Sequence, residues 1–198
     1  MRVPTLETAR LLVRELDRGD LAAVRQLLDV DLAETDAGEP IATLAERQRW
    51  LEWTIDSYLQ LATLRQPPYG ERAIVLKDSG ELIGACGFVP CLAPFYRLPA
   101  LRLAGVAAPG EGSVPEVGLY WAVSPAYQRQ GYATEAASAL ISYAFGTLNL
   151  RRIVATTDYT NVASMGVMRK LGMRLERNPS PEPHWLQVVG VLDRTLLG

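Results

Sequence analysis

An apolar strand, a short glycine-containing loop and an amphipathic helix follow one another between residues 117 and 146, and this succession constrains the fold most strongly. Residues 117–123 are rich in aromatic and β-branched residues, and the Ser124-Pro125 pair that follows is typical of a strand ending in a turn. After the loop, apolar residues recur at helical spacing, and Gly146 is typical of a helix C-terminus. The expected buried stripe comprises Ala136, Ala137, Leu140, Ile141, Ala144 and Phe145.

The loop between strand and helix has the composition of a phosphate-binding turn. It comprises Gln128, Arg129, Gln130, Gly131, Tyr132, Ala133 and Thr134. A helix start carries free backbone N–H groups and partial positive charge, so a backbone that can approach a ligand closely there binds phosphate oxygens. Gly131 allows the close approach, Ala133 is small, and Arg129 supplies a charged donor. The same spacing also fits an ordinary strand-to-helix turn with a solvated arginine.

The pattern Gln128-x-x-Gly131-x-Ala133 resembles the Gln/Arg-x-x-Gly-x-Gly/Ala signature of the GCN5-related N-acetyltransferases, the GNAT superfamily. In that family the loop holds the pyrophosphate of acetyl-CoA. The resemblance therefore implies acetyl-CoA as cofactor, bound by the residues of the loop.

Two further stretches resemble the same family and lie in the family's order. Residues 161–173, with Asn161-x-x-Ser164 at their start, are similar to the helix that follows the family's fifth strand. Residues 8–14 resemble the opening strand of the branch that acetylates ribosomal-protein N-termini. With the elements between them, the three matches cover nearly the whole chain.

The resemblance implies an α/β fold of the GNAT acyl-CoA acyltransferase type. Its sheet is mixed, mostly antiparallel and twisted, with about seven strands, helices on both faces, and fourth and fifth strands that splay apart. We expect one domain over residues 1–198, with a long proline-rich insertion loop at 90–115. Local patterns place the strands at 10–16, 72–77, 81–88, 117–123, 152–157, 174–176 and 185–195.

Helix starts carry clear local signals. Asp17 to Asp20 form an N-cap, Thr43-x-x-Glu46 is a capping box for a long helix that ends before Pro67, and Asn161 begins the last helix. The acidic segment between the first two helices lacks periodicity and is expected to be a loop. Its acids are Asp29, Asp31, Glu34, Asp36 and Glu39.

In the family, the pantetheine arm of the cofactor pairs with the exposed backbone of the fourth strand. Trp121, Ala122 and Val123 stand at the matching place, and one of their N–H groups would polarise the thioester carbonyl. Their side chains can at the same time be core. Asn161, Ser164 and Met168 share one helix face, which in the family is turned toward the pantetheine arm.

The acid of the reaction is expected to be Ser164. Many family members carry Tyr where Met168 stands, and that Tyr protonates the departing thiolate, whereas Met has no proton to give. The resemblance to the ribosomal-protein branch thus implies Ser164, or a water in its place. On local pattern alone, Asn161 is an N-cap and Ser164 a solvated hydroxyl in the first turn.

The candidate base is Glu116, which leads into the fourth strand, where relatives carry a catalytic Glu. It sits one or two residues further upstream than that Glu, and a shift of one residue reverses the face of a strand residue. A solvated residue at a strand start is the other interpretation. Glu182 and His184, in a proline-rich loop, are weaker candidates.

Composition narrows the partners and the compartment. A formal net charge of -2 and a pI near 5.5 argue against a nucleic-acid binder, and no apolar run is long enough to predict a membrane span. Two cysteines and one histidine are too few for a disulfide framework or a metal site, so we expect no metal and a reducing, cytoplasmic location. The number of subunits stays open, a homodimer included.

The sequence as a whole predicts an acyltransferase that moves acetyl from acetyl-CoA directly to a primary amine. The expected acceptor is an α-amino group of a peptide or protein N-terminus, or of a small molecule. The alternative is a non-catalytic acyl-CoA-binding regulatory or scaffolding module. Met168 and the displaced Glu116 keep that alternative open.

Overall fold

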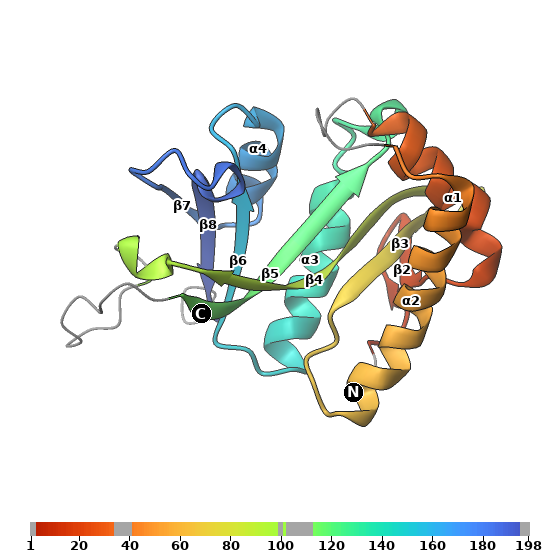
Figure 1. Cartoon of the computed structure of the whole chain (residues 1–198), viewed down its shortest axis with the longest axis horizontal. Helices are drawn as coiled ribbons and strands as arrows, with labels where there is room; N and C mark the ends of the chain where they lie inside the picture. The colour runs from red at the N-terminus through yellow and green to blue at the C-terminus, as the bar shows by residue number, and fades with distance from the viewer. Residues whose placement is uncertain (1–2, 34–40, 99–100, 102–112, 195–198) are drawn as a thin grey trace. The chain divides into compact units, whose positions relative to one another are not determined.

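A computed structural model describes residues 3–33, 41–98, 101 and 113–194 (Figure 1). The chain divides into two compact units, residues 1–88 with 120–140 and residues 89–119 with 141–198. Strands β4 (Leu82–Ala93) and β5 (Val114–Val123) and helix α3 (Tyr132–Gly146) each contribute to both units.

The eight strands belong to one sheet, in the order β1-β2-β3-β4-β5-β6-β8-β7. The pairs β1/β2, β2/β3, β3/β4, β6/β8 and β7/β8 are antiparallel, and β5/β6 is parallel, with Gly118 opposite Val154. The predicted mixed, mostly antiparallel sheet is thereby confirmed. The sheet has one strand more than the seven that local patterns predicted. The additional strand is β1 (Leu6–Glu7), whose two residues are too few to give a periodic signal.

In the first unit, β2 (Leu11–Glu15) pairs with β3 (Gly70–Leu76), which forms a hairpin with β4. The hairpin turns at Gly80, whose φ of 72° lies in the left-handed region that glycine adopts without strain. The predicted hairpin is confirmed, and β4 continues past the predicted end at residue 88 to Ala93.

Three helical segments, η1 (Arg18–Asp20), α1 (Leu21–Arg25) and η2 (Gln26–Asp31), follow β2, and α2 (Leu44–Thr63) is the long helix that the capping box predicted. The Thr43 side chain accepts from Glu46 N, and the Glu46 carboxylate accepts from Thr43 N at 2.8 Å. In Figure 1, α1 and α2 lie against β2 and β3. The core between them comprises Leu16, Val24, Leu51, Ala73 and Val75.

The acidic segment differs from the expected loop. Asp29 and Asp31 lie in η2, a π-helical segment, and Asp29 is buried. Its carboxylate forms a two-point ion pair with Arg47 of α2, at 2.5 and 3.0 Å. The burial of Asp29 depends on an arginine eighteen residues away, which the local sequence pattern does not indicate. Glu34, Asp36 and Glu39 lie outside the described residues.

Helix α3 buries the predicted stripe, from Ala136 to Phe145. Its end differs from the expectation, because Gly146 is the last helical residue and not a left-handed cap. The left-handed residue is Asn149, with φ of 57°. Asparagine tolerates this conformation better than most residues, so it can take the place expected for glycine.

The second unit contains β6 (Arg152–Thr157), α4 (Val162–Lys170), β7 (Arg174–Arg177), η6 (His184–Leu186) and β8 (Val188–Asp193). These elements match the predicted strand, helix and final pair of strands, except that β8 begins after a short 3-10 turn. Gly172 follows α4 with φ of 78° and terminates it as predicted.

The segment between the strands is shorter than the predicted insertion at 90–115. The first residues of that insertion complete β4, its last two begin β5, and η3 (Phe95–Arg97) lies between them. Phe95, Leu98 and Leu101 are buried in a cluster with Val154 and residues of the β8 segment, so this part belongs to the core. Residues 99–100 and 102–112 lie outside the described range. None of the helices in the described ranges has the length and apolar character needed to cross a bilayer.

Candidate functional site

The predicted phosphate loop, residues 128–134, lies in the first unit, where it follows the short turn η5 (Pro125–Tyr127) and runs into the first residues of helix α3. Arg129 and Gly131 both have left-handed backbones, with φ of 63° and 87°. A backbone that enters this region twice within three residues turns sharply, and turns of this kind form anion-binding concavities. A left-handed arginine is uncommon, and such outliers cluster at functional sites.

The backbone N–H groups at the start of α3 precede the hydrogen-bond ladder of the helix. The first bond of the helical ladder runs from Glu135 N to Gly131 O at 3.0 Å, so the preceding N–H groups lie before the ladder begins. Gln128, Arg129 and Gln130 are exposed. The arrangement is the one that the sequence predicted, and phosphate binding to it stays a prediction.

The side chains of the loop fix its shape. Gln128 Nε2 donates to the carbonyl of Val123 at 2.9 Å, which ties the loop to the end of β5. Gln130 Nε2 donates to Ala126 O at 3.3 Å. The two glutamines of the loop therefore hold its backbone in place.

Two residues that the sequence analysis did not assign, Arg10 and Glu135, also contact the loop region. Arg10 donates to the carbonyl of Gln130, and Glu135 stands in the first turn of α3. Residues 8–14 are notable in the sequence only because they resemble the opening strand of a family branch. No local signal connects it with a helix 125 residues later.

The end of β5 has one edge turned toward β4. Ser124 N donates to Ile83 O at 2.9 Å, and a Cβ added to Gly84 would lie 2.4 Å from Ala122 O. Backbone groups of alternate strand residues point to opposite edges, so Trp121 and Val123 present theirs on the other edge. The donation of Gln128 to Val123 O agrees with this assignment. Of the three predicted residues, Trp121 and Val123 thus have their backbone groups on the edge that faces away from β4, and an N–H contact with the cofactor stays a prediction.

In the second unit, the first turn of α4 is held by two side chains. Asn161 Oδ1 accepts from Ser164 N at 2.9 Å, which confirms Asn161 as an N-cap. Asp158 accepts from the backbone N–H groups of Thr160 and Asn161. The pKa of Asp158 is lowered mainly by the hydrogen bond from the Thr160 hydroxyl, and further by the bond from the Thr160 backbone N–H, although partial burial raises it. Ser164 contributes its backbone N–H to the cap, and its hydroxyl is not part of this motif.

Met168 is fully buried, whereas Asn161 and Ser164 are partly exposed. A Cβ added to Gly190 of β8 would lie 3.0 Å from the sulfur atoms of both Met168 and Met173. The glycine thus makes room for both thioethers. This packing is that of a core residue, and a contact of Met168 with the cofactor stays a prediction.

Glu116, the candidate base, lies in an ion-pair network. Its Oε1 is 3.1 Å from Arg152 Nη1, and Arg152 Nε is 2.8 Å from Asp193 Oδ1. All three side chains are at least four-fifths buried. Burial lowers the pKa of Arg152, but the hydrogen bond to Asp193 and the two carboxylate charges outweigh it and raise that pKa. Glu116 is thus engaged in an ion pair with Arg152.

We expect Glu116→Gln to lower the free energy of unfolding by about 1 kcal/mol, because Arg152 loses one of its two carboxylates and keeps the other. The alkaline limb of the pH–rate profile is expected to stay unchanged. Urea unfolding and kcat against pH check the two statements. A flattened limb with unchanged stability would instead identify Glu116 as the base.

The weaker candidates lie at the surface. Glu182 and His184 are exposed, and His184 begins η6. Neither is held by a described contact with the other predicted residues of the second unit.

The two cysteines are free thiols, as expected. Burial raises the pKa of Cys86 to about 12, and burial together with the charge of Glu116 raises that of Cys91 to about 11. A protonated thiol is a poor nucleophile. Both residues are therefore unsuited to carry an acetyl group, which agrees with direct transfer.

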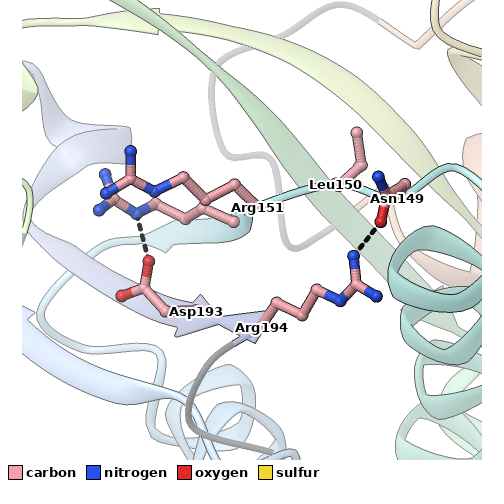
Figure 2. A pocket seen from close by; sticks show the side chains of 6 residues that line it. Asn149, Leu150, Arg151, Asp193 and Arg194 are labelled. Carbon is pink, nitrogen blue, oxygen red and sulfur yellow. Dashed lines mark hydrogen bonds and ion pairs between the residues drawn. The ribbon is translucent and has the colours of Figure 1, made fainter.

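A cavity of about 430 Å³ lies in the second unit at the end of β8 (Figure 2). It is lined by Asn149, Leu150, Arg151, Arg152, Asp193 and Arg194. Figure 2 shows Arg194 reaching Asn149, and Arg152 is paired with Asp193. None of the predicted cofactor-binding residues lines it. Across the described ranges, no three His, Cys, Asp or Glu side chains are grouped as metal ligands would be.

Comparison with known proteins gives a family match over most of the chain. A family model described as an acetyltransferase (GNAT) domain matches residues 10–174. The spermidine N(1)-acetyltransferase of Escherichia coli (strain K12) is 39% identical over 177 residues, which cover 88% of this chain and 77% of that protein. The matches with two further relatives, both described as uncharacterized N-acetyltransferases of Bacillus subtilis (strain 168), span only 33% and 57% of those proteins.

Solved structures share the fold over nearly the whole length. An acetyltransferase from Agrobacterium tumefaciens str. C58 superposes with a TM-score of 0.68 at 26% identity, covering 98% of this chain and 96% of that one. A ribosomal alpha-N-protein acetyltransferase in complex with coenzyme A superposes with a TM-score of 0.64 at 16% identity, covering 95% and 96%. The second likeness concerns the fold alone.

Proposed function

Because the chain belongs to the GNAT acetyltransferase family, we propose that it transfers the acetyl group of acetyl-CoA directly to a primary amine. The observation that carries the proposal is the loop before α3, where left-handed Arg129 and Gly131 precede the first N–H groups of the helix. Such a site suits the pyrophosphate of acetyl-CoA. The shape of the loop is already supported by the side chains of Gln128 and Gln130.

The proposed reaction needs a donor that polarises the thioester carbonyl and an acid that protonates the departing thiolate. The N–H of Trp121 or Val123 donates to the thioester carbonyl, whose oxygen gains negative charge as the amine attacks. The new C–N bond forms, the C–S bond breaks, and the amine proton leaves to water. Ser164 gives its hydroxyl proton to the departing thiolate and is reprotonated by solvent. Neither cysteine takes part.

The acceptor that suits this site is an α-amine. An α-amino group with a pKa of about 8 costs about 1 kcal/mol to deprotonate at pH 7, whereas a lysine amine near 10.4 costs about 4 to 5 kcal/mol. Glu116 is engaged with Arg152, so a strong base is not assigned. A water-mediated base is sufficient for the more acidic amine.

A second acceptor class, polyamines, is supported by the relative that acetylates spermidine and shares 39% of its residues over 88% of this chain. Asp29, which is paired with Arg47, does not add to this support, because the arginine already compensates its charge. The two acceptor classes differ in charge, so the salt dependence of kcat/KM distinguishes them.

We expect kcat/KM to be higher for peptides with a free N-terminus than for matched N-blocked peptides with one lysine, and higher than for spermidine. The measurement is release of CoA thiol with each acceptor at two salt concentrations. A preference for spermidine that falls steeply with salt would assign the polyamine class instead. CoA binding without thiol release for any amine would indicate the non-catalytic acyl-CoA-binding module.

A further inference from the structure

Arg10 joins the opening segment of the chain to the loop by contacts on either side of Gly131. Its Nη1 donates to the carbonyl of Gln130 at 3.1 Å. Its guanidinium carbon lies 4.2 Å from the ring centroid of Tyr132, within the range of a cation–π contact. Its Nε and Nη2 lie 2.7 and 2.6 Å from Glu135 Oε2. One side chain therefore contacts three residues of the loop and the first helical turn.

The backbone that carries Arg10 is itself anchored to the sheet. Lys77, directly after β3, donates its N–H to Arg10 O at 3.0 Å and its ammonium to Thr8 O at 2.7 Å. Leu11 N donates to Thr8 Oγ1 at 2.9 Å. The position of the guanidinium is thus set from the sheet, outside the loop.

Glu135 places a negative charge in the turn where the cofactor's pyrophosphate would bind. Burial raises its pKa, but hydrogen bonds from the Thr8 hydroxyl and from Arg10 outweigh the burial and lower that pKa. The group is therefore a carboxylate at neutral pH. Without a partner it would repel a pyrophosphate, and Arg10 supplies the compensating charge.

We propose that Arg10 is a positioning residue for the phosphate loop, which holds Gln130 and Tyr132 in place and neutralises Glu135 beside the bound pyrophosphate. The inference rests on the proposed function, because it takes the loop as the cofactor site. Arg10 acts through the loop and Glu135, and a direct contact with phosphate is not required.

The test compares Arg10→Met with Arg18→Met, which makes the same charge change on the exposed turn η1. Calorimetry with CoA is expected to show a dissociation constant raised about tenfold to hundredfold for Arg10→Met, the range for a lost hydrogen bond to a charged group. Arg18→Met is expected to stay within about twofold of the wild type.

A second readout separates positioning from general damage. The KM for acetyl-CoA is expected to rise in Arg10→Met with kcat unchanged within about twofold. With S-acetylpantetheine, which lacks the pyrophosphate, kcat/KM is expected to equal that of the wild type. Loss of folding would lower the rate with both donors.

Two further variants keep the test decisive. In Arg10→Met/Glu135→Gln the unpaired charge is gone, so part of the CoA affinity is expected to return. Arg10→Lys keeps the charge but lacks the fork that reaches both Glu135 and Gln130, so an intermediate affinity is expected even if Arg10→Met folds poorly.

Equal CoA affinity in Arg10→Met and wild type, or an equal loss with both donors in a variant that is still folded, would overturn the positioning role. If the double variant does not regain CoA affinity, Arg10 does not act by compensating the charge of Glu135. If the wild type itself does not bind CoA, the proposed function fails together with the inference. If the wild type binds CoA and the Arg10 variants bind it with the same affinity, the proposed function stands and the inference fails.

Discussion

Gly131→Asp is expected to raise the dissociation constant of CoA by at least about a hundredfold. Gly131 has φ of 87°, and a side chain at this backbone angle costs about 1 to 3 kcal/mol. The new carboxylate would face the pyrophosphate, and two like charges about 4 Å apart repel by about 4 kcal/mol at an effective dielectric constant of 20. Either effect is large, because 1.4 kcal/mol corresponds to a tenfold change in affinity.

Steric conflict inside the protein is not the reason. A Cβ on Gly131 would meet Arg10 Nη2 at 3.5 Å, an ordinary contact distance. The loss of affinity must come from backbone strain and from charge. Arg10 can attract the new carboxylate, and this pairing would itself remove the compensation of Glu135.

The matched control is Gly146→Asp, at the other end of the same helix. A Cβ there meets nothing within 4 Å, and the site lies roughly 20 Å along the helix axis from the loop. CoA affinity measured by calorimetry is expected to stay within about twofold of the wild type. Equal affinity in both variants would remove the loop from the cofactor site.

Ser164→Ala is expected to lower kcat about a hundredfold while the dissociation constant of CoA changes less than about threefold. General acid groups contribute about 10²- to 10⁴-fold to the rate, and they act on the transition state more than on bound substrate. The variant is structurally mild, because Ser164 gives its backbone N–H, not its hydroxyl, to the Asn161 cap. The helix start therefore survives the change.

Single-turnover rates with acetyl-CoA and the best amine provide the measurement, and Ser138→Ala on the exposed side of α3 is the control. The control is expected to retain the wild-type rate. A loss below about threefold in Ser164→Ala would assign the proton to a water molecule.

Elements with local signals could be predicted from the sequence. The Thr43–Glu46 capping box sets the start of α2, and the spacing of apolar residues in α3 sets its buried face. The phosphate loop could be placed for the same reason, since strand, glycine and helix are adjacent in the chain. These features depend on interactions within a few residues.

Features that depend on distant partners could not be predicted. Asp29 is buried because Arg47 pairs with it, and β4 extends to Ala93 because Phe95 and Leu98 join the core of the second unit. The ion pairs of Arg152 with Glu116 and Asp193 likewise join residues that are far apart in the chain. Periodicity contains no information about such pairings, and the Arg10 to Glu135 contact, 125 residues apart, is the extreme case.

The interleaving of the two units has a consequence for synthesis of the protein. Residues 1–88 need residues 120–140 to complete the first unit, and residues 89–119 emerge from the ribosome between them. The opening strands and α2 can fold early, but Arg10 meets the phosphate loop only after the chain has been translated to Gln130, 120 positions further on. Nascent chains stalled before residue 128 should therefore fail to bind CoA, and a fragment cut at residue 88 should expose the β4 edge to aggregation.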